Sequence, residues 1–333
     1  MVVALSGYYG FHNAGDEALL EAIVQEVKVR GHTPLVLSKN PAETQQRYGV
    51  RAVKRTHPLE VWRALGEADL LLSGGGTLLQ DKTSSASLWY YLSVIRMARM
   101  RGKPVHVFNQ SLGPLSPRGE KAVQRALKGV QVFMRDRDSL EYARRLGLQA
   151  DLGADCAMLL NAPPVEREPK MVVLVPRAGF DDANRTLAQT AERLRELGYE
   201  VVILAMQPGH DEGALEFFPG FTAELAWDPR RVFYLLAQAG YVISIRLHGV
   251  ILAAAAGTPF AGLSYDPKVA GFCRDARAPF QEIPGEPEAF VRLVEQNVQP
   301  DWGAVQEMKA RASTSFDRVL SGPRDRKVAS SRN

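Results

Sequence analysis

The feature that most constrains the fold is a regular alternation of two kinds of segment. Short, uniformly apolar runs such as Val2–Ser6 and Met171–Val175 alternate with helix-length amphipathic stretches, and a polar or glycine-containing loop separates each pair. Uniformly apolar runs of this length are typical of strands that are covered on both faces, and helical connections between such strands give a parallel sheet. The sequence therefore predicts an α/β protein from its first residues onward.

A second feature divides this pattern in two. The chain has 333 residues, which is long for a single core, and a stretch rich in proline and charge (161–169) interrupts the alternation. We expect two doubly wound, Rossmann-like domains, residues 1–162 and 170–300, that face a cleft as in the glycosyltransferase-B-like fold. A C-terminal helix and a basic tail should occupy 301–333, and the tail from 322 is expected to fray.

Composition restricts the partners. The net charge of +4 is small for this length, so nucleic acid is not an expected partner, although an anionic substrate is. The start lacks the features of a signal peptide, and the longest apolar stretch, 249–263, contains Pro259 and is shorter than the ~20 residues that span a bilayer. Cys156 and Cys273 are expected to be buried thiols in a reducing compartment. We expect a cytoplasmic protein and leave open its oligomeric state and a peripheral contact with the inner face of the membrane.

The stretch Ser244–Gly249 is the main candidate site. It follows an apolar run and precedes a helix of small residues, so Arg246 and His248 lie where a strand turns into a helix. Ligands bind at that end of the strands in open α/β sheets, and the start of a helix favours anions. Arginine is a permanent cation, and histidine can hold a proton near neutral pH. The stretch predicts a site that binds an anion and protonates it.

The loops after other strands carry weaker signals. The glycines of the loop Gly7–Glu17 do not match the dinucleotide-binding fingerprint, so NAD and FAD are not expected. Asn13 and Asp16 either cap the following helix or act on the substrate, and Asp16 is suited to accept a proton from a sugar hydroxyl. The run Gly74–Gly76 either makes a tight turn or allows a ligand to approach the backbone.

Cations follow several strands. Arg135 and Arg137 stand beside two aspartates, so they either form ion pairs at the start of the next helix or bind an anion, and we favour Arg135 for binding. Arg177 follows a strand and has no evident helical partner. Lys268 follows Asp266 and Pro267 at an expected helix start, where it is either solvated or part of a phosphate site.

Together these loops resemble the polysaccharide pyruvyl transferase family, most closely its CsaB-type members. Each motif is short, but their order along most of the chain is specific. The matching segments are Gly7–Leu19, Ser73–Asp81, Gln110–Pro114, Arg135–Ser139, Arg246–Gly249 and Tyr265–Val269.

The resemblance implies transfer of a pyruvyl group from phosphoenolpyruvate to two hydroxyls of one sugar, with formation of a cyclic ketal and release of phosphate. It implies a lipid-linked acceptor saccharide that contains N-acetylmannosamine, for a cell-wall polysaccharide that anchors surface-layer (S-layer) proteins. It also implies that Arg246 is a donor ligand and His248 the catalytic acid.

Residue chemistry agrees with this reading. Phosphoenolpyruvate carries a carboxylate and a phosphate and needs several cations, and its methylene carbon must be protonated by a general acid. No step requires a metal or a redox cofactor. The expected residues are His248 and Asp16 for catalysis, Arg246, Arg135, Arg177 and Lys268 for phosphoenolpyruvate, and Asn13, Gly75 and Gln110 for the acceptor.

Two other functions fit the same fold. One is a nucleotide-sugar glycosyltransferase, but the spaced pair of glutamates that often follows the equivalent strand in such retaining enzymes does not occur after Arg246. The other is a non-catalytic sugar- or lipid-binding protein, which the clustered arginine and histidine residues disfavour.

Overall fold

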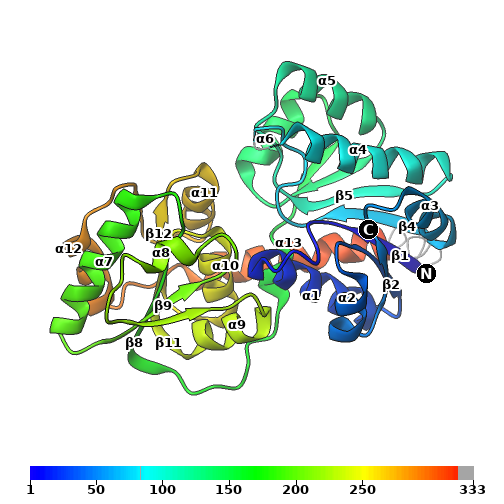
Figure 1. Cartoon of the computed structure of the whole chain (residues 1–333). Helices are drawn as coiled ribbons and strands as arrows, with labels where there is room; N and C mark the ends of the chain where they lie inside the picture. The colour runs from blue at the N-terminus through cyan, green and yellow to red at the C-terminus, as the bar shows by residue number, and fades with distance from the viewer. Residues whose placement is uncertain (83, 322–333) are drawn as a thin grey trace. The chain divides into compact units, whose positions relative to one another are not determined.

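The computed structural model describes residues 1–82 and 84–321, so the expectation for the tail from 322 lies outside the described residues. Contacts divide the chain into two compact units (Figure 1). Unit 1 comprises 1–11, 19–156 and the described residues from Lys309 onward, and unit 2 comprises 12–18 and 157–308. The division therefore does not follow the order of the chain, because a short N-terminal segment groups with unit 2 and the end of the last helix groups with unit 1.

Unit 1 is built on a seven-stranded parallel sheet with the order β3-β2-β1-β4-β5-β6-β7. The order reverses between β1 and β4, which makes that gap the point where a doubly wound sheet binds ligands. The strands are β1 (Val2–Ser6), β2 (Thr33–Ser38), β3 (Arg51–Lys54), β4 (Leu70–Gly74), β5 (Val105–Gln110), β6 (Gln131–Met134) and β7 (Ala150–Leu152), and the helices are α1 (Ala14–Val29), α2 (Pro41–Tyr48), α3 (Pro58–Glu67), α4 (Ser85–Met100), α5 (Pro117–Ala126), α6 (Arg137–Arg145) and the end of α13 (Trp302–Leu320).

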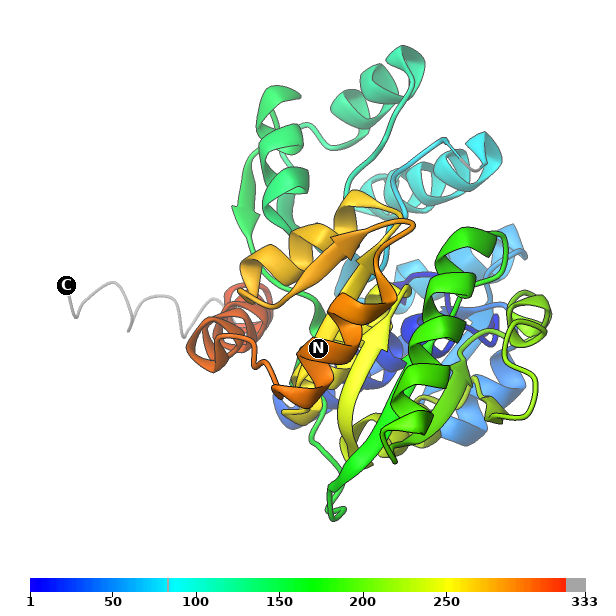
Figure 2. The ribbon, with the colours of Figure 1, turned by 90° about the vertical axis from the view of Figure 1, so that its left-hand side faces the viewer.

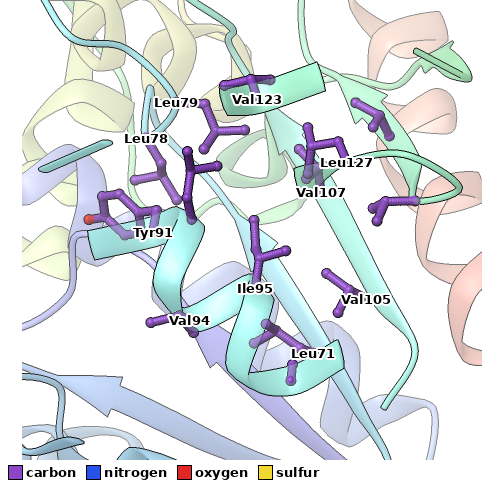
Figure 3. Close-up of a cluster of buried hydrophobic side chains, with 14 of the residues drawn as sticks. Leu71, Leu78, Leu79, Tyr91, Val94, Ile95, Val105, Val107, Val123 and Leu127 are labelled. Atoms are coloured by element: carbon purple, nitrogen blue, oxygen red, sulfur yellow. The ribbon is translucent and has the colours of Figure 1, made fainter. Parts of the chain in front are cut away.

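The main core of unit 1 lies between the sheet and α3, α4 and α5 (Figure 3). Helix α4 buries Leu88, Tyr91 and Ile95 at helical spacing, and these side chains pack on strand residues such as Leu71 and Val107. Uniformly buried strands such as β4 need a cover on their other face as well. Figure 1 shows α1, α2 and α13 on the face of the sheet opposite α4.

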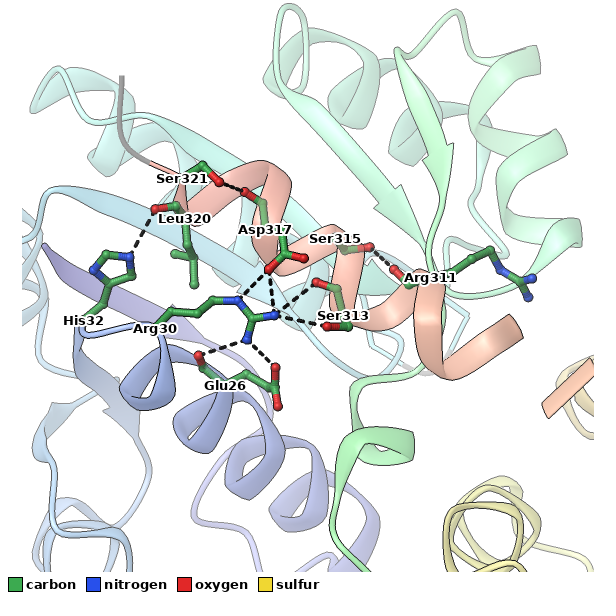
Figure 4. A network of polar contacts seen from close by, with 9 residues as sticks. All are labelled: Glu26, Arg30, His32, Arg311, Ser313, Ser315, Asp317, Leu320 and Ser321. Atoms are coloured by element: carbon green, nitrogen blue, oxygen red, sulfur yellow. Dashed lines mark hydrogen bonds and ion pairs between the residues drawn. The ribbon is translucent and has the colours of Figure 1, made fainter. Parts of the chain in front are cut away.

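Helix α13 is held against α1 by a polar network (Figure 4). Arg30 at the end of α1 donates from Nε to a carboxylate oxygen of Asp317 over 2.9 Å, and from Nη2 to the hydroxyl of Ser313 over 3.1 Å. The ring of Phe316 is buried and lies 4.7 Å from that of Phe108 on β5. The last helix therefore contributes to the core of unit 1.

Unit 2 repeats the architecture on a six-stranded parallel sheet with the order β10-β9-β8-β11-β12-β13. Its order reverses between β8 and β11. The strands are β8 (Glu168–Val175), β9 (Glu200–Ala205), β10 (Thr222–Leu225), β11 (Ala239–Ser244), β12 (Phe260–Ser264) and β13 (Phe280–Glu282), and the helices are α7 (Asp181–Glu196), α8 (Glu212–Leu215), α9 (Pro229–Gln238), α10 (Leu247–Ala256), α11 (Pro267–Asp275) and α12 (Pro287–Glu295).

Helices cover both faces of this sheet. Figure 2 shows α7 and α12 side by side, and they pack against each other, whereas α10 packs between α9 and α11. Helix α10 buries every residue from Gly249 to Ala255, so it is an interior helix that fixes the end of β11 in place.

These elements confirm the predicted α/β class and the two doubly wound sheets. One boundary is corrected, because β8 begins at Glu168 and takes up the end of the stretch predicted as a linker. No helix within residues 1–82 and 84–321 combines the length and the apolar character that crossing a membrane requires.

Candidate functional site

The two strands that flank the switch point of unit 2 place two arginines at one level. Val175 of β8 pairs with Ser244 of β11, and the amide of Ile245 donates to the carbonyl of Val175 over 3.0 Å. Arg177 and Arg246 each lie two residues beyond this pair. The strand register therefore brings both arginines to the carboxyl edge of the sheet, where this fold binds ligands.

Close packing fixes the turn from β11 into α10. The hydroxyl of Ser244 donates to the carbonyl of Arg246 over 2.7 Å, and a Cβ on Gly249 would lie 2.1 Å from that hydroxyl oxygen. Only glycine fits there. Arg246 is the N-cap of α10 and gives no side-chain cap, so the first amides of this ten-residue helix are left to other acceptors.

Arg246 is a buried cation with a counterion. Its side chain bonds the carboxylate of Asp211, and its Nη2 donates to Oε1 of Gln207 over 3.2 Å. Asp211 is 1% exposed and Arg246 is 8% exposed. The Nε of Arg246 has no hydrogen-bond partner in the described part of the chain. Asp211 and Gln207 thus hold the guanidinium at Nη2, and its Nε remains available to donate to a ligand.

Arg177 is a partly buried cation of a different kind. Its Nη1 donates to the hydroxyl of Tyr265 over 2.6 Å, and its guanidinium carbon lies 4.7 Å from the centre of that ring. Burial lowers the pKa of Arg177, and no carboxylate among the described residues lies within ion-pair distance of it. An anion would supply the missing counterion.

Lys268 begins α11 at the end of the next strand. Its Nζ is 3.7 Å from a carboxylate oxygen of Asp266, and its amide donates to that carboxylate over 3.0 Å. Asp266 is therefore the N-cap of α11, which confirms the expected helix start. The ammonium is partly exposed, with 28% of its side chain accessible, so it can still contact a ligand.

Residues 12–18 complete the cluster. Asn13 caps α1, because its Oδ1 accepts from the amide of Gly15 over 3.0 Å, and its Nδ2 donates to Oε1 of Gln207 over 3.2 Å. The amide of Ala14 donates to the carbonyl of Met206 over 3.1 Å. One glutamine oxygen therefore links Asn13 with Arg246.

His248 in the first turn of α10 lies directly against this segment. A Cβ on Gly15 would be 2.1 Å from Nδ1 of His248, so the imidazole rests on the backbone of Gly15. Asp16 is the next residue, and both His248 and Asp16 are partly buried. The two predicted catalytic residues thus belong to one part of the molecule.

The other predicted residues belong to unit 1. Arg135 is buried, with Nε donating to the hydroxyl of Ser111 over 2.7 Å, Nη1 to Asp155 over 2.9 Å and Nη2 to Thr77 over 3.2 Å. Its charge is compensated by Asp155. Arg137, by contrast, is exposed at the start of α6.

Gln110 and Gly75 lie at the carboxyl edge of the same sheet. Gln110 is fully buried, and neither its Nε2 nor its Oε1 has a hydrogen-bond partner within the described residues. Gly75 has a φ of +79°, and its amide donates to the carbonyl of Phe108 over 3.1 Å, which supports the tight-turn interpretation.

Asp211, Gln207 and Tyr265 are the site residues that the sequence did not reveal. Gln207 and Asp211 follow β9, and Tyr265 follows β12. Their position after strands was visible, but their partners depend on the strand order. Among residues 1–82 and 84–321, no group of three or more histidine, cysteine or acidic side chains is arranged to hold a metal ion.

Comparison with known families decides the assignment. Residues 13–267 match the family model for polysaccharide pyruvyl transferase. The chain belongs to the polysaccharide pyruvyl transferase family. The matched range contains every residue of the cluster in unit 2 except Lys268, which lies one residue beyond it.

Solved structures share the fold of this family member at low identity. A glycosyltransferase from Rickettsia africae ESF-5 has a TM-score of 0.56 and 10% identity, and the match covers 96% of this chain and 94% of that chain. A UDP-GlcNAc 2-epimerase from Neisseria meningitidis bound to UDP-GlcNAc has a TM-score of 0.58 and 11% identity, covering 96% and 99%. A UGT transferase from Siraitia grosvenorii in complex with UDP has a TM-score of 0.54 and 13% identity, covering 96% of each chain.

At these identities the likeness shows the fold alone, and it confirms the glycosyltransferase-B-like prediction. Comparison with curated proteins gave no match.

Proposed function

We propose that this pyruvyl transferase uses phosphoenolpyruvate and builds a cyclic ketal on a saccharide, in the manner of the CsaB-type members. The observation that carries the proposal is the cluster in unit 2. Arg177 and Arg246 flank the switch point of the sheet, and His248 in the first turn of α10 lies against the backbone of Gly15, next to Asp16.

The donor site follows from charge and position. Phosphoenolpyruvate carries a carboxylate and a phosphate, and we assign them to Arg177, Arg246, Lys268 and the first amides of α10. Arg177 is the strongest candidate because it is partly buried and makes no ion pair within the described residues. Arg246 offers its Nε while Asp211 and Gln207 hold its orientation. Arg135, which is paired with Asp155 in unit 1, remains a proposed anion ligand on the sequence pattern.

The proposed chemistry moves protons between named groups. His248 donates a proton to the methylene carbon of phosphoenolpyruvate, which leaves positive charge at C2. One sugar hydroxyl adds to C2 and gives up its proton to Asp16. The C2–O bond to phosphate then breaks, and the departing phosphate takes the proton held by Asp16. The second hydroxyl closes the ketal at C2, and its proton returns to His248. The scheme consumes one phosphoenolpyruvate and releases one phosphate, without a metal or a redox cofactor.

The acceptor substrate is proposed by its chemical class. We propose a lipid-linked saccharide with N-acetylmannosamine, pyruvylated for a cell-wall polysaccharide that anchors S-layer proteins. Asn13 in unit 2 and Gly75 and Gln110 in unit 1 are its proposed contacts. The buried, unpartnered amide of Gln110 supports this role, because such a group gains from a polar ligand. A cytoplasmic location with contact at the inner face of the membrane would suit such an acceptor.

The test is a direct assay. Purified protein receives phosphoenolpyruvate and a synthetic lipid-linked disaccharide, and phosphate release and product mass are measured. We expect a pyruvyl ketal. Turnover of a UDP-sugar with indifference to phosphoenolpyruvate would instead establish the nucleotide-sugar glycosyltransferase that shares this fold.

His248→Ala tests the acid. General acid catalysis contributes about 10²- to 10⁴-fold, and we expect a loss of that size with little change in thermal stability. His210→Ala is the matched control, because His210 is exposed on the loop after β9 and should leave the rate unchanged. Full activity of His248→Ala would refute the assignment.

A further inference from the structure

Unit 1 contains a buried cation that the proposed chemistry does not use. Arg55 follows β3 and is 7% exposed. Its Nη1 donates to the carbonyl of Gly7 over 3.1 Å. Its guanidinium carbon lies 4.2, 5.1 and 5.2 Å from the ring centres of Tyr90, Phe11 and Tyr91. No carboxylate in residues 1–82 and 84–321 forms an ion pair with it.

The aromatic rings compensate this charge only in part. Burial of an unpaired ion is strongly unfavourable, and cation–π contacts offset only part of that cost. Arg55 therefore differs from Arg135 and Arg246, each of which is neutralised by a buried aspartate. A buried arginine without a counterion is a site that gains from binding an anion.

A second donor lies beside it. The hydroxyl of Tyr90 is buried, and no acceptor for its proton lies within hydrogen-bond distance among the described residues. Burial raises the pKa of Tyr90, so the hydroxyl keeps its proton and can donate it. An anion held between Arg55 and Tyr90 would satisfy both groups at once.

A further cation and a flat aromatic surface adjoin the pair. Lys39 follows β2 and is exposed, its Nζ lies 5.9 Å from the ring centre of Phe11, and it makes no ion pair within the described residues. Phe11 stacks on Tyr8 with 3.9 Å between ring centres and 7° between planes, and both rings are partly exposed. Backbone bonds from Lys39 to Tyr9 (3.0 Å) and from Arg55 to Ser38 (2.9 Å) hold the strand ends together.

We propose that Arg55, Lys39 and Tyr90 form an anion site that binds a phosphate or diphosphate group of the saccharide acceptor. Two cations and a hydroxyl suit a group of charge near −2, and arginine binds phosphate oxygens through paired donors. The Tyr8–Phe11 pair is placed to pack against the apolar face of a neighbouring sugar ring. The identity of the ligand as the acceptor rests on the proposed function, whereas the anion site itself does not.

Binding is tested first, without turnover. Inorganic pyrophosphate is titrated into Arg246→Ala protein, in which the donor site is weakened, and the heat is measured. We expect saturable binding that Arg55→Met weakens at least tenfold and that Lys39→Met weakens less. Because Lys39 is exposed, its variant should fold even where the Arg55 variant does not. Pyrophosphate binding that neither substitution changes would refute the site, whatever the enzyme's activity.

Kinetics then identifies the source of the phosphate. The acceptor disaccharide is compared as a diphosphate ester and as its uncharged methyl glycoside. We expect Arg55→Met to raise the KM of the diphosphate acceptor at least tenfold and to leave the KM values of the methyl glycoside and of phosphoenolpyruvate unchanged. An equal rise for both acceptors would indicate a structural role, and a rise confined to phosphoenolpyruvate would assign the site to the donor. Either result would overturn the proposal.

Discussion

Gly15→Ala tests the placement of His248 without changing any functional group. Gly15 lies in the first turn of α1 with a φ that alanine also adopts, so the substitution puts no strain on the backbone. The added Cβ would lie 2.1 Å from Nδ1, 2.4 Å from Cγ and 2.8 Å from Cβ of His248. Because ordinary contact begins near 3.4 Å, the imidazole must move by 3.4 − 2.1 = 1.3 Å.

A displacement of this size has a predictable effect. Misplacing a catalytic group by ~1 Å costs up to about 10²-fold in rate, which corresponds to about 2.7 kcal/mol of activation free energy. Stability should change less, because alanine is favoured over glycine in a helix by about 0.5–1 kcal/mol and overpacking costs about 1–3 kcal/mol. We expect Gly15→Ala to lower kcat by about 10²-fold while thermal denaturation shifts by a few degrees.

Two further variants isolate the cause. Gly213→Ala in α8 is the control, because a Cβ there would meet nothing within 4 Å, and it should keep the original kcat. In the double variant with His248→Ala the steric conflict is gone, so its activity should equal that of His248→Ala alone. The reasoning is refuted if Gly15→Ala turns over as fast as Gly213→Ala.

Two other predictions concern ion pairs. Asp211→Asn leaves Arg246 buried without a counterion, so urea denaturation should show a free energy of unfolding lower by about 3–5 kcal/mol. Saturating phosphoenolpyruvate should restore part of this loss, because it binds the folded state. Unchanged stability would contradict the pairing. Arg30→Met removes the hydrogen bonds from the end of α1 to α13, and calorimetry should show a free energy of unfolding lower by about 1–3 kcal/mol. An unchanged Tm would mean that packing alone holds α13.

The central elements of both sheets could be predicted from the sequence. Val2–Ser6 was predicted with the bounds that the structure has, because buried strands are uniformly apolar, and the C-terminal helix expected within 301–333 is α13. The edge strands β3, β7, β10 and β13 were missed. Each has three or four residues, pairs on one side only and is largely exposed or half-buried, so no apolar run marks it.

The candidate site could be predicted in part. The positions of Arg177, Arg246 and His248 after strands follow from the local pattern, since a strand that turns into a helix is visible in sequence. Their hydrogen-bond partners cannot be predicted from the local pattern, because Asp211 is 35 residues from Arg246 and Tyr265 is 88 residues from Arg177. Such pairs depend on strand order and register, which residue patterns leave undetermined.

The packing of α13 has a consequence for how the protein forms during synthesis. Unit 1 begins with the first strand, yet its cover includes Phe316 and the bonds from Arg30 to Asp317 and Ser313. When residues 1–156 have left the ribosome, the apolar surface around Phe108 is therefore still exposed. The last helix, which covers this surface, is synthesised only after all of unit 2. Unit 2 can fold before that helix is synthesised, because its N-terminal segment 12–18 has already been made. We expect the half of the protein that is translated first to be the half that is completed last.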